Sequence, residues 1–258
     1  MIAVHDLRKQ YGSFIAVDGV NLDVQPGQIH GFLGPNGAGK TTTIRMIAGL
    51  LKPTSGRVIV NRHDLATDPE GAKASLGFIP DRPYIYEKLT AGEFLQFHAG
   101  LYGMNGNGTA QRVHEILELF ELGRWEHELV ESFSHGMKQR LVMCAAFLHH
   151  PKAVLVDEPM VGLDPRGAKL IKSVFKRMSE RSVAILMSTH TLEVAQEMCD
   201  RISIILKGRI IASGTVDELR ALAANAGGAQ QQGKAAELTE VFLKLTGGTG
   251  LQEIDEIV

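Results

Sequence analysis

The segment Gly34-Pro35-Asn36-Gly37-Ala38-Gly39-Lys40-Thr41-Thr42 (GPNGAGKTT) decides the fold of this 258-residue chain. It fits the pattern GxxxxGK(S/T) and stands between a β-rich run, QIHGFLG, and a helical pattern at roughly 40–50. Glycines let a loop curl with its N–H groups pointing inward, and the following helix adds the positive end of its dipole. We therefore predict a phosphate-binding loop in which Lys40 reaches the β- and γ-phosphates of a nucleotide and Thr41 ligates Mg²⁺. A glycine-rich turn that binds no ligand is the alternative.

A second segment with side chains suited to catalysis is AVLVDEP, residues 153–159. A buried apolar strand that ends in two carboxylates carries charge into the protein unless a cation lies there. Asp157 fits the role of a Mg²⁺ ligand. Glu158 is expected on the other side of the strand, where it orients or deprotonates an attacking water. The alternative is a strand end whose acids simply meet solvent, and the phosphate loop upstream disfavours it.

β-rich runs alternate with helical patterns along the chain, which indicates an α/β fold with a largely parallel sheet. The expected strands are 2–7, 20–24, 28–34, 56–60, 75–80, 153–158, 183–190 and 202–208. From about 90 to 150 the pattern is mainly helical, and we interpret this block as a lobe inserted between strands. The predicted fold is a P-loop NTPase core with a mainly parallel sheet, an N-terminal antiparallel β region and this inserted helical lobe.

The C-terminal part of the sequence changes in composition. The predicted nucleotide-binding domain spans residues 1–221, and residues 222–235 (LAANAGGAQQQGKA) are rich in Ala, Gly and Gln, which predicts a linker. Residues 236–258 begin with an amphipathic helical pattern that places Leu238, Val241, Phe242 and Leu245 on one face. That face either packs on the chain's own domain or binds a partner.

Composition and charge exclude some classes of protein. The formal net charge is −2, whereas nucleic-acid binders usually carry a basic excess, so we expect no direct nucleic-acid partner. Cys144 and Cys199 form no CxxC pair and are expected to be reduced core residues. The N-terminus lacks an apolar secretory segment, and no run approaches the roughly 18 apolar residues that cross a bilayer. We expect a cytoplasmic protein that reaches a membrane through a partner.

With its two main motifs, the chain resembles the ABC (ATP-binding cassette) ATPase family over most of its length, from about Ile2 to Gly214. Tyr11, in RKQYGSFIAV, lies where the family places an aromatic residue that stacks on adenine. Val17 ends the same segment, and the resemblance implies that it also contacts ATP. His190, in MSTH, takes the place of the catalytic histidine that senses the γ-phosphate.

The resemblance also implies residues that act on a partner subunit. FSHGMKQR, residues 133–140, stands where the family has its signature, and GLD, which ends at Asp164, resembles the loop that touches the partner. Ser134 and Gly136 begin a helix, so a hydroxyl and free N–H groups face outward and can hold a phosphate. In the family, the signature of one subunit closes over the nucleotide bound to the other.

Two positions depart from the family's pattern. The common signature is Leu-Ser-Gly-Gly-Gln, whereas this chain has His135 in place of a glycine and Met137 in place of the glutamine. Where the family usually has a glutamine that touches Mg²⁺ and water, SLGFIPDRP offers Asp81, whose carboxylate is expected to reach the metal.

Three functions compete at this point. The first is the ATP-hydrolysing motor of a transporter, which pairs with a copy or a homologue, sandwiches two ATP molecules with Mg²⁺ and drives separate transmembrane permease subunits. The second is a soluble ABC ATPase in translation or on DNA, which typically has two cassettes, a coiled-coil insertion or basic surfaces. The third is an unrelated P-loop GTPase or kinase, but the chain has no NKxD motif. We expect the first, and FSHGMKQRL and LTEVFLKLTGG resemble bacterial exporter-type subunits.

Overall fold

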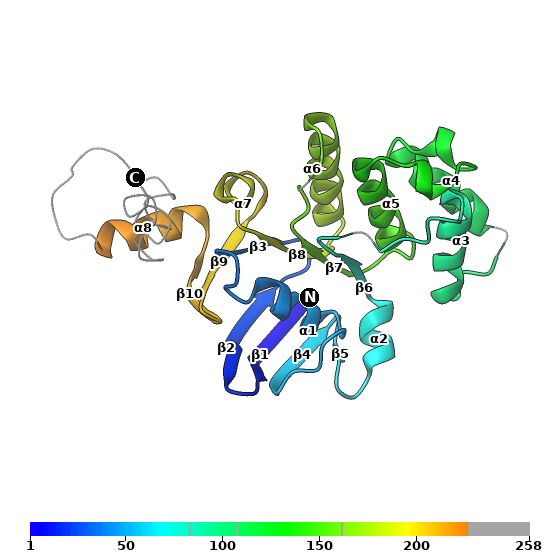
Figure 1. The fold of residues 1–258 in the computed structure, drawn as a ribbon. Helices are drawn as coiled ribbons and strands as arrows, with labels where there is room; N and C mark the ends of the chain where they lie inside the picture. Colours follow the sequence, from blue (N-terminus) through cyan, green and yellow to red (C-terminus); the bar gives the residue numbers. More distant parts are fainter. Residues whose placement is uncertain (83, 107, 161, 227–258) are drawn as a thin grey trace.

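A computed structural model describes residues 1–82, 84–106, 108–160 and 162–226 of the chain. Its centre is a six-stranded sheet in the order β10-β9-β3-β8-β7-β6 (Figure 1). Neighbouring strands run parallel except for the edge pair β9 and β10, so the mainly parallel sheet is confirmed. The strands are β3 (Ile29–Leu33), β6 (Leu76–Ile79), β7 (Ala153–Asp157), β8 (Ala184–Thr189), β9 (Arg201–Leu206) and β10 (Arg209–Gly214). Strands β3, β7 and β8 are buried throughout, which explains their mainly apolar sequences.

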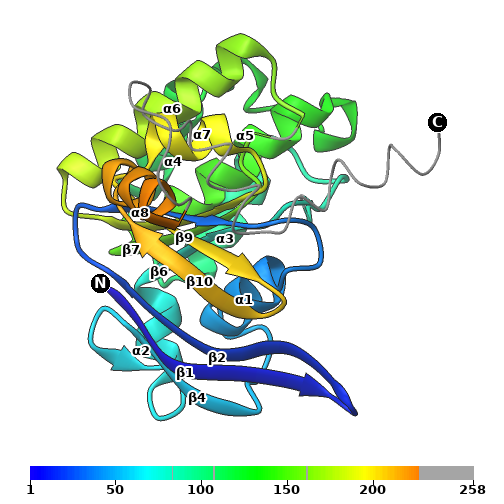
Figure 2. The ribbon, with the colours of Figure 1, turned by 90° about the vertical axis from the view of Figure 1, so that its left-hand side faces the viewer.

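A second sheet has four antiparallel strands in the order β2-β1-β4-β5, and this confirms the N-terminal antiparallel region. Its strands are β1 (Ile2–Tyr11), β2 (Phe14–Val24), β4 (Ser55–Val60) and β5 (His63–Asp64). Figure 2 shows β1 and β2 as a long hairpin below β9 and β10. Both strands extend beyond the predicted ranges because their outer halves are exposed and carry no simple apolar alternation.

Helix α1 (Lys40–Ile47) packs between the two sheets. Ile44 and Ile47 are fully buried, in one apolar cluster with Phe32 of β3 and Leu7 of β1. The helix ends before residue 50 because Gly49 has a φ of +68°, a left-handed conformation that terminates helices. This packing fixes the N-terminus of α1, and therefore the loop before it.

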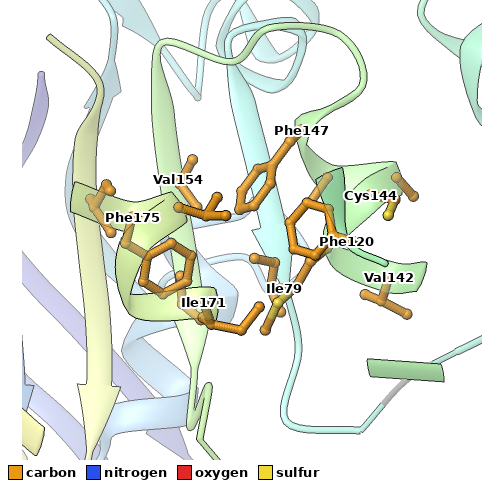
Figure 3. Close-up of a cluster of buried hydrophobic side chains, with 14 of the residues drawn as sticks. Ile79, Phe120, Val142, Cys144, Phe147, Val154, Ile171 and Phe175 are labelled. Atoms are coloured by element: carbon orange, nitrogen blue, oxygen red, sulfur yellow. The ribbon is translucent and has the colours of Figure 1, made fainter. Parts of the chain in front are cut away.

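The helical lobe consists of α3 (Ala91–Leu101), α4 (Gly108–Leu119), α5 (His135–Phe147) and the short 3₁₀ turns Gly123–Trp125 and Val130–Ser132, as predicted for about 90–150. It shares an apolar core with the sheet and with α6 (Pro165–Glu180). Figure 3 shows Phe147 of α5 beside Phe120, and Phe175 of α6 nearby. The ring centroid of Phe147 lies 5.9 Å from that of Phe120 and 6.2 Å from that of Phe175. The lobe is thus packed on the core through α5.

The remaining helices are α2 (Pro69–Ala74), α7 (Leu192–Met198) and α8 (Val216–Ala226). Helices α6 and α7 lie on the face of the six-stranded sheet away from the antiparallel sheet (Figure 1). Over the residues that the structure describes, none of the helices has both the length and the apolar character needed to cross a bilayer.

The linker expected at 222–235 begins later than predicted. Helix α8 continues to Ala226, because the alanines and leucine at its end are strong helix formers even though their composition is simple. The segment 227–235 and the amphipathic pattern of 236–258 lie outside the described residues.

Candidate functional site

The loop between β3 and α1 has the backbone that its glycines were expected to provide. Gly37 and Gly39 have φ values of +77° and +109°, which other residues rarely adopt. A Cβ on Gly39 would also lie 2.7 Å from the carbonyl oxygen of Ala16, and one on Gly34 would collide with the carbonyl of Ile205. The loop therefore curls closely against both sheets, as the motif predicts.

Lys40 holds its ammonium group inside this loop. Its side chain is buried, and Nζ donates hydrogen bonds to the carbonyl oxygens of Gly34 (2.6 Å) and Pro35 (3.1 Å). Burial lowers the pKa of Lys40, while Glu158 and Asp157 act in the opposite direction. A cation is thus positioned where the motif requires one for phosphate groups.

Asp157, the last residue of β7, is buried and only half satisfied. Its Oδ1 accepts a hydrogen bond from the hydroxyl of Ser188 on β8. Its Oδ2 has no hydrogen-bond partner in the described part of the chain. Because a buried carboxylate oxygen without a partner is costly, this atom has the character of a cation ligand.

Glu158 lies just beyond the end of β7, in a left-handed conformation with φ of +52°. The strand alternation that was expected to separate it from Asp157 therefore does not apply, because the strand has already ended. The two carboxylates have different hydrogen-bond partners, Ser188 for Asp157 and His190 for Glu158. Oε1 of Glu158 lies 2.9 Å from Nδ1 of His190 and 3.8 Å from Nζ of Lys40. His190 and Lys40, which come from separate parts of the sequence, thus both lie close to the carboxylate of Glu158.

The segment that was expected to bind adenine is only partly accessible to a ligand. Tyr11 ends β1 with its ring half exposed, and Nζ of Lys9 lies 5.0 Å from the ring centroid. Val17, by contrast, is fully buried in the core, so its side chain is not available to a ligand. Ala16 is partly exposed and its carbonyl lies beside Gly39. Val17 is buried and Ala16 partly exposed at a place where the β1–β2 register shifts, between Leu7 and Lys9.

Thr41 and Thr42 lie in the first turn of α1, and Asp81 lies two residues after β6, the strand next to β7. All three are partly buried. Their phosphate and metal roles stay predictions.

The residues expected to act on a partner lie at two helix N-termini. Ser134 is the exposed N-cap of α5, and its Oγ accepts a hydrogen bond from the N–H of Met137 (3.3 Å). Gly136, in the first turn, is half-buried. Asp164 is the N-cap of α6, with Oδ1 accepting from the N–H of Gly167 (2.7 Å). Each cap is a hydrogen bond to the first turn of its own helix. The action of the three residues on a partner subunit stays a prediction.

Comparison with known proteins agrees with this geometry. The sequence model of the ABC transporter family matches residues 17–161. The chain is 37% identical over 225 residues to the Probable multidrug ABC transporter ATP-binding protein YbhF of Escherichia coli K12, which covers 87% of this chain. The chain spans only 39% of the length of that relative.

Two solved structures share the fold. An ATP-binding subunit of an ABC transporter superposes with a TM-score of 0.86 and 33% identity, covering 95% of this chain and 99% of that one. A dimeric post-hydrolysis state of the ATP-binding cassette MJ0796, bound to ADP and Pi, gives a TM-score of 0.75 and 25% identity, with 83% and 98% covered. The chain therefore belongs to the ABC transporter family, as one of its ATP-binding cassettes.

Proposed function

We propose that this chain hydrolyses ATP as the motor subunit of an ABC exporter, paired with a second cassette and driving separate membrane-spanning subunits. The observation that carries the proposal is the carboxylate of Glu158, which lies against both His190 and the phosphate-loop cation Lys40. A base that is oriented by a third group, beside a cation for the phosphates, is the arrangement that hydrolysis of a phosphoanhydride needs.

Each of these residues has its own role in ATP hydrolysis. Lys40 turns from the carbonyls of its own loop to the β- and γ-phosphates and stabilises the charge that develops there. Glu158 accepts a proton from the water whose oxygen attacks the γ-phosphorus, and His190 orients that carboxylate. The bond between the γ-phosphorus and the oxygen bridging to the β-phosphate breaks, and ADP and phosphate leave. Tyr11 offers an exposed ring for the base.

The donor set also fits Mg²⁺. The unpartnered Oδ2 of Asp157 is a hard oxygen ligand in a buried position, and Thr41 and Asp81 are the further predicted ligands. When bound, the ion neutralises charge on the phosphate oxygens. Ser188 holds the other oxygen of Asp157 and so orients the carboxylate toward that role.

The signature segment, residues 133–140, supports the pairing of two cassettes. Ser134 and Gly136 present a helix N-terminus that suits the phosphates of a second chain's nucleotide, and Asp164 belongs to the same surface in the family. The dimeric state described for MJ0796 supports this arrangement. The description of YbhF as a probable multidrug transporter protein supports export.

A group of exposed aromatic and apolar side chains supports a separate membrane partner. Tyr86 and Phe97 meet edge to face at 5.5 Å, and both are exposed. Tyr84, Leu101 and Tyr102 add further exposed apolar surface on the same part of the chain, between Asp81 and α4. Such surface in one region is typical of an interface with another protein. We place the chain on the cytoplasmic face of the membrane, held there by its permease.

The experiment is to purify the chain with the membrane protein that it binds and to measure phosphate release in lipid vesicles and in solution. We expect ATP hydrolysis that the membrane protein stimulates, and activity lower by roughly 10²–10³ for Lys40→Ala. For Glu158→Gln, we expect ATP to bind while turnover nearly stops. Near-normal activity of Lys40→Ala, or purification with ribosomes or DNA and no membrane protein, would overturn the proposal.

A further inference from the structure

The side chain of His135 contacts a residue that lies 27 positions further along the sequence. His135 is the first residue of α5, directly after the N-cap Ser134. Its imidazole fills the space where a Cβ on Gly162 would stand: Nε2 lies 2.7 Å from that point, and Cδ2 lies closer still. Gly162 has a φ of +77°, a conformation that favours glycine, and a Cβ there would force the exposed imidazole of His135 to move.

The next residue of α5 is also near Gly162. A Cβ placed on Gly136 would lie 3.6 Å from the carbonyl oxygen of Gly162, so the first turn of α5 passes close to that backbone. Gly162 is followed by Leu163 and by Asp164, which caps α6. The contact therefore joins the start of α5 to the segment that leads into α6.

Glu121, in the turn after α4, adds a second connection between the two helices. Its carboxylate accepts hydrogen bonds from Arg166 of α6 (2.7 and 3.2 Å) and lies 3.7 Å from Arg140 of α5. Arg166 is largely exposed, so this ion pair contributes little free energy by itself. The packing of His135 on Gly162 is a further contact that joins the two N-termini, at shorter range.

We propose that His135 is a positioning residue, whose ring holds residues 162–164 against the first turn of α5. Ser134 and Asp164 are then presented to the second cassette as one rigid surface. This inference rests on the proposed function, since only a paired cassette uses that surface. It does not apply to the common signature, because a glycine at this position has no ring to make the contact.

A double-mutant cycle tests the contact. Gly162→Ala adds a Cβ that collides with the ring, and we expect it to lower kcat by more than about tenfold in the native chain. In the His135→Gly background, Gly162→Ala should lower kcat by less than about threefold, because there is no ring to collide with. The backbone strain of alanine at this position is the same in both backgrounds. His135→Gly alone should lower kcat severalfold and leave the affinity of the isolated chain for ATP unchanged, since the chain's own nucleotide loop is not touched.

His135→Phe is the matched control, because it keeps a flat ring and removes the nitrogens. Gly162→Ala should lower kcat by the same factor in the His135→Phe background as in the native chain. Gly162→Asn gives the same comparison with less backbone strain, since Asn tolerates left-handed φ, and it serves if the alanine variant does not fold. Affinity of each isolated variant for ATP reports folding and the integrity of its own nucleotide site.

Two results separate failure of this inference from failure of the proposed function. If Gly162→Ala and Gly162→Asn change kcat by the same factor with and without His135→Gly, while every variant still binds ATP, His135 does not position residues 162–164. If the native chain itself neither binds nor hydrolyses ATP, the proposed function fails instead.

Discussion

Nδ1 of His190 lies 2.9 Å from Oε1 of Glu158, at the carboxyl ends of two neighbouring strands. Strands β7 and β8 thus bring the proposed base and its proposed orienting group to one point, and Lys40 approaches the same oxygen to 3.8 Å. Parallel strands place their carboxyl ends at one edge of a sheet, which is why residues 32 positions apart meet there.

Loss of His190 should therefore impair the step that uses Glu158. We expect His190→Ala to lower kcat by on the order of 10²-fold, because the carboxylate loses its orienting partner, with little change in the affinity for ATP. His190→Gln retains a hydrogen-bond donor and should recover part of the rate. Single-turnover kinetics distinguishes the chemical step from binding. Equal rates for native and alanine chains would separate His190 from catalysis.

Asp157→Asn should have opposite effects on activity and stability. The change keeps an acceptor for Ser188 but removes a buried charge whose second oxygen has no hydrogen-bond partner among the described residues. Without metal and nucleotide, we expect the melting temperature to rise by a few degrees, since about 1 kcal/mol shifts it by roughly 2–4 °C in a chain this long. The Mg²⁺ concentration for half-maximal hydrolysis should increase at least about tenfold. Unchanged Mg²⁺ dependence would contradict the assignment.

Tyr11 should tolerate Phe and not Ala, because its half-exposed ring offers a face for stacking and no base-specific group. The Tyr11→Ala chain should lose about 1–2 kcal/mol of ATP affinity, which is the scale of stacking between a base and an aromatic ring. Titration of a fluorescent ATP analogue measures all three affinities. Three equal values would place the base elsewhere.

His30, buried in β3, should make the fold sensitive to acid. Burial, with a smaller contribution from Arg201, lowers its pKa from 6.5 to about 4, and its Nε2 is 2.8 Å from the hydroxyl of Ser203. The unfolded chain takes up a proton near pH 6.5 and the folded chain only near pH 4. Stability is therefore constant above this window and falls as the pH decreases through it, by up to about 3 kcal/mol.

His30→Phe should flatten part of that slope in urea unfolding measured between pH 7 and 4. Some slope remains, because burial also lowers the pKa of His149 to about 4. An unchanged slope in the His30→Phe chain would show that His30 does not carry the effect.

Much of the site could be predicted from sequence because its determinants are local. The curled loop of 34–42 follows from its glycines, and the carboxylates after β7 follow from an apolar run that ends in charge. Alternating β and helical patterns likewise predicted the parallel sheet and the inserted lobe. The two helix caps, Ser134 and Asp164, follow from residue type.

Other features depend on contacts between distant segments. Val17 is buried and Ala16 partly exposed at a register shift in the β1–β2 pair, which no local pattern marks. The left-handed backbone of Glu158 cancels the alternation expected there. The contact of His135 with Gly162 joins two loops that only the packing of α5 and α6 brings together.

The central claim is that each nucleotide site needs two chains, and mixing two inactive variants tests it most directly. Glu158→Gln removes the base, while Ser134→Asp keeps a good N-cap for α5 but places a negative charge where the partner's phosphates are expected. A mixed pair carries both changes in one site and none in the other. We predict that each variant alone is nearly inactive and that an equal mixture recovers about a quarter of native activity for random pairing of independent sites. A mixture that stays as inactive as its components, with mixed pairs shown to form, would contradict the account.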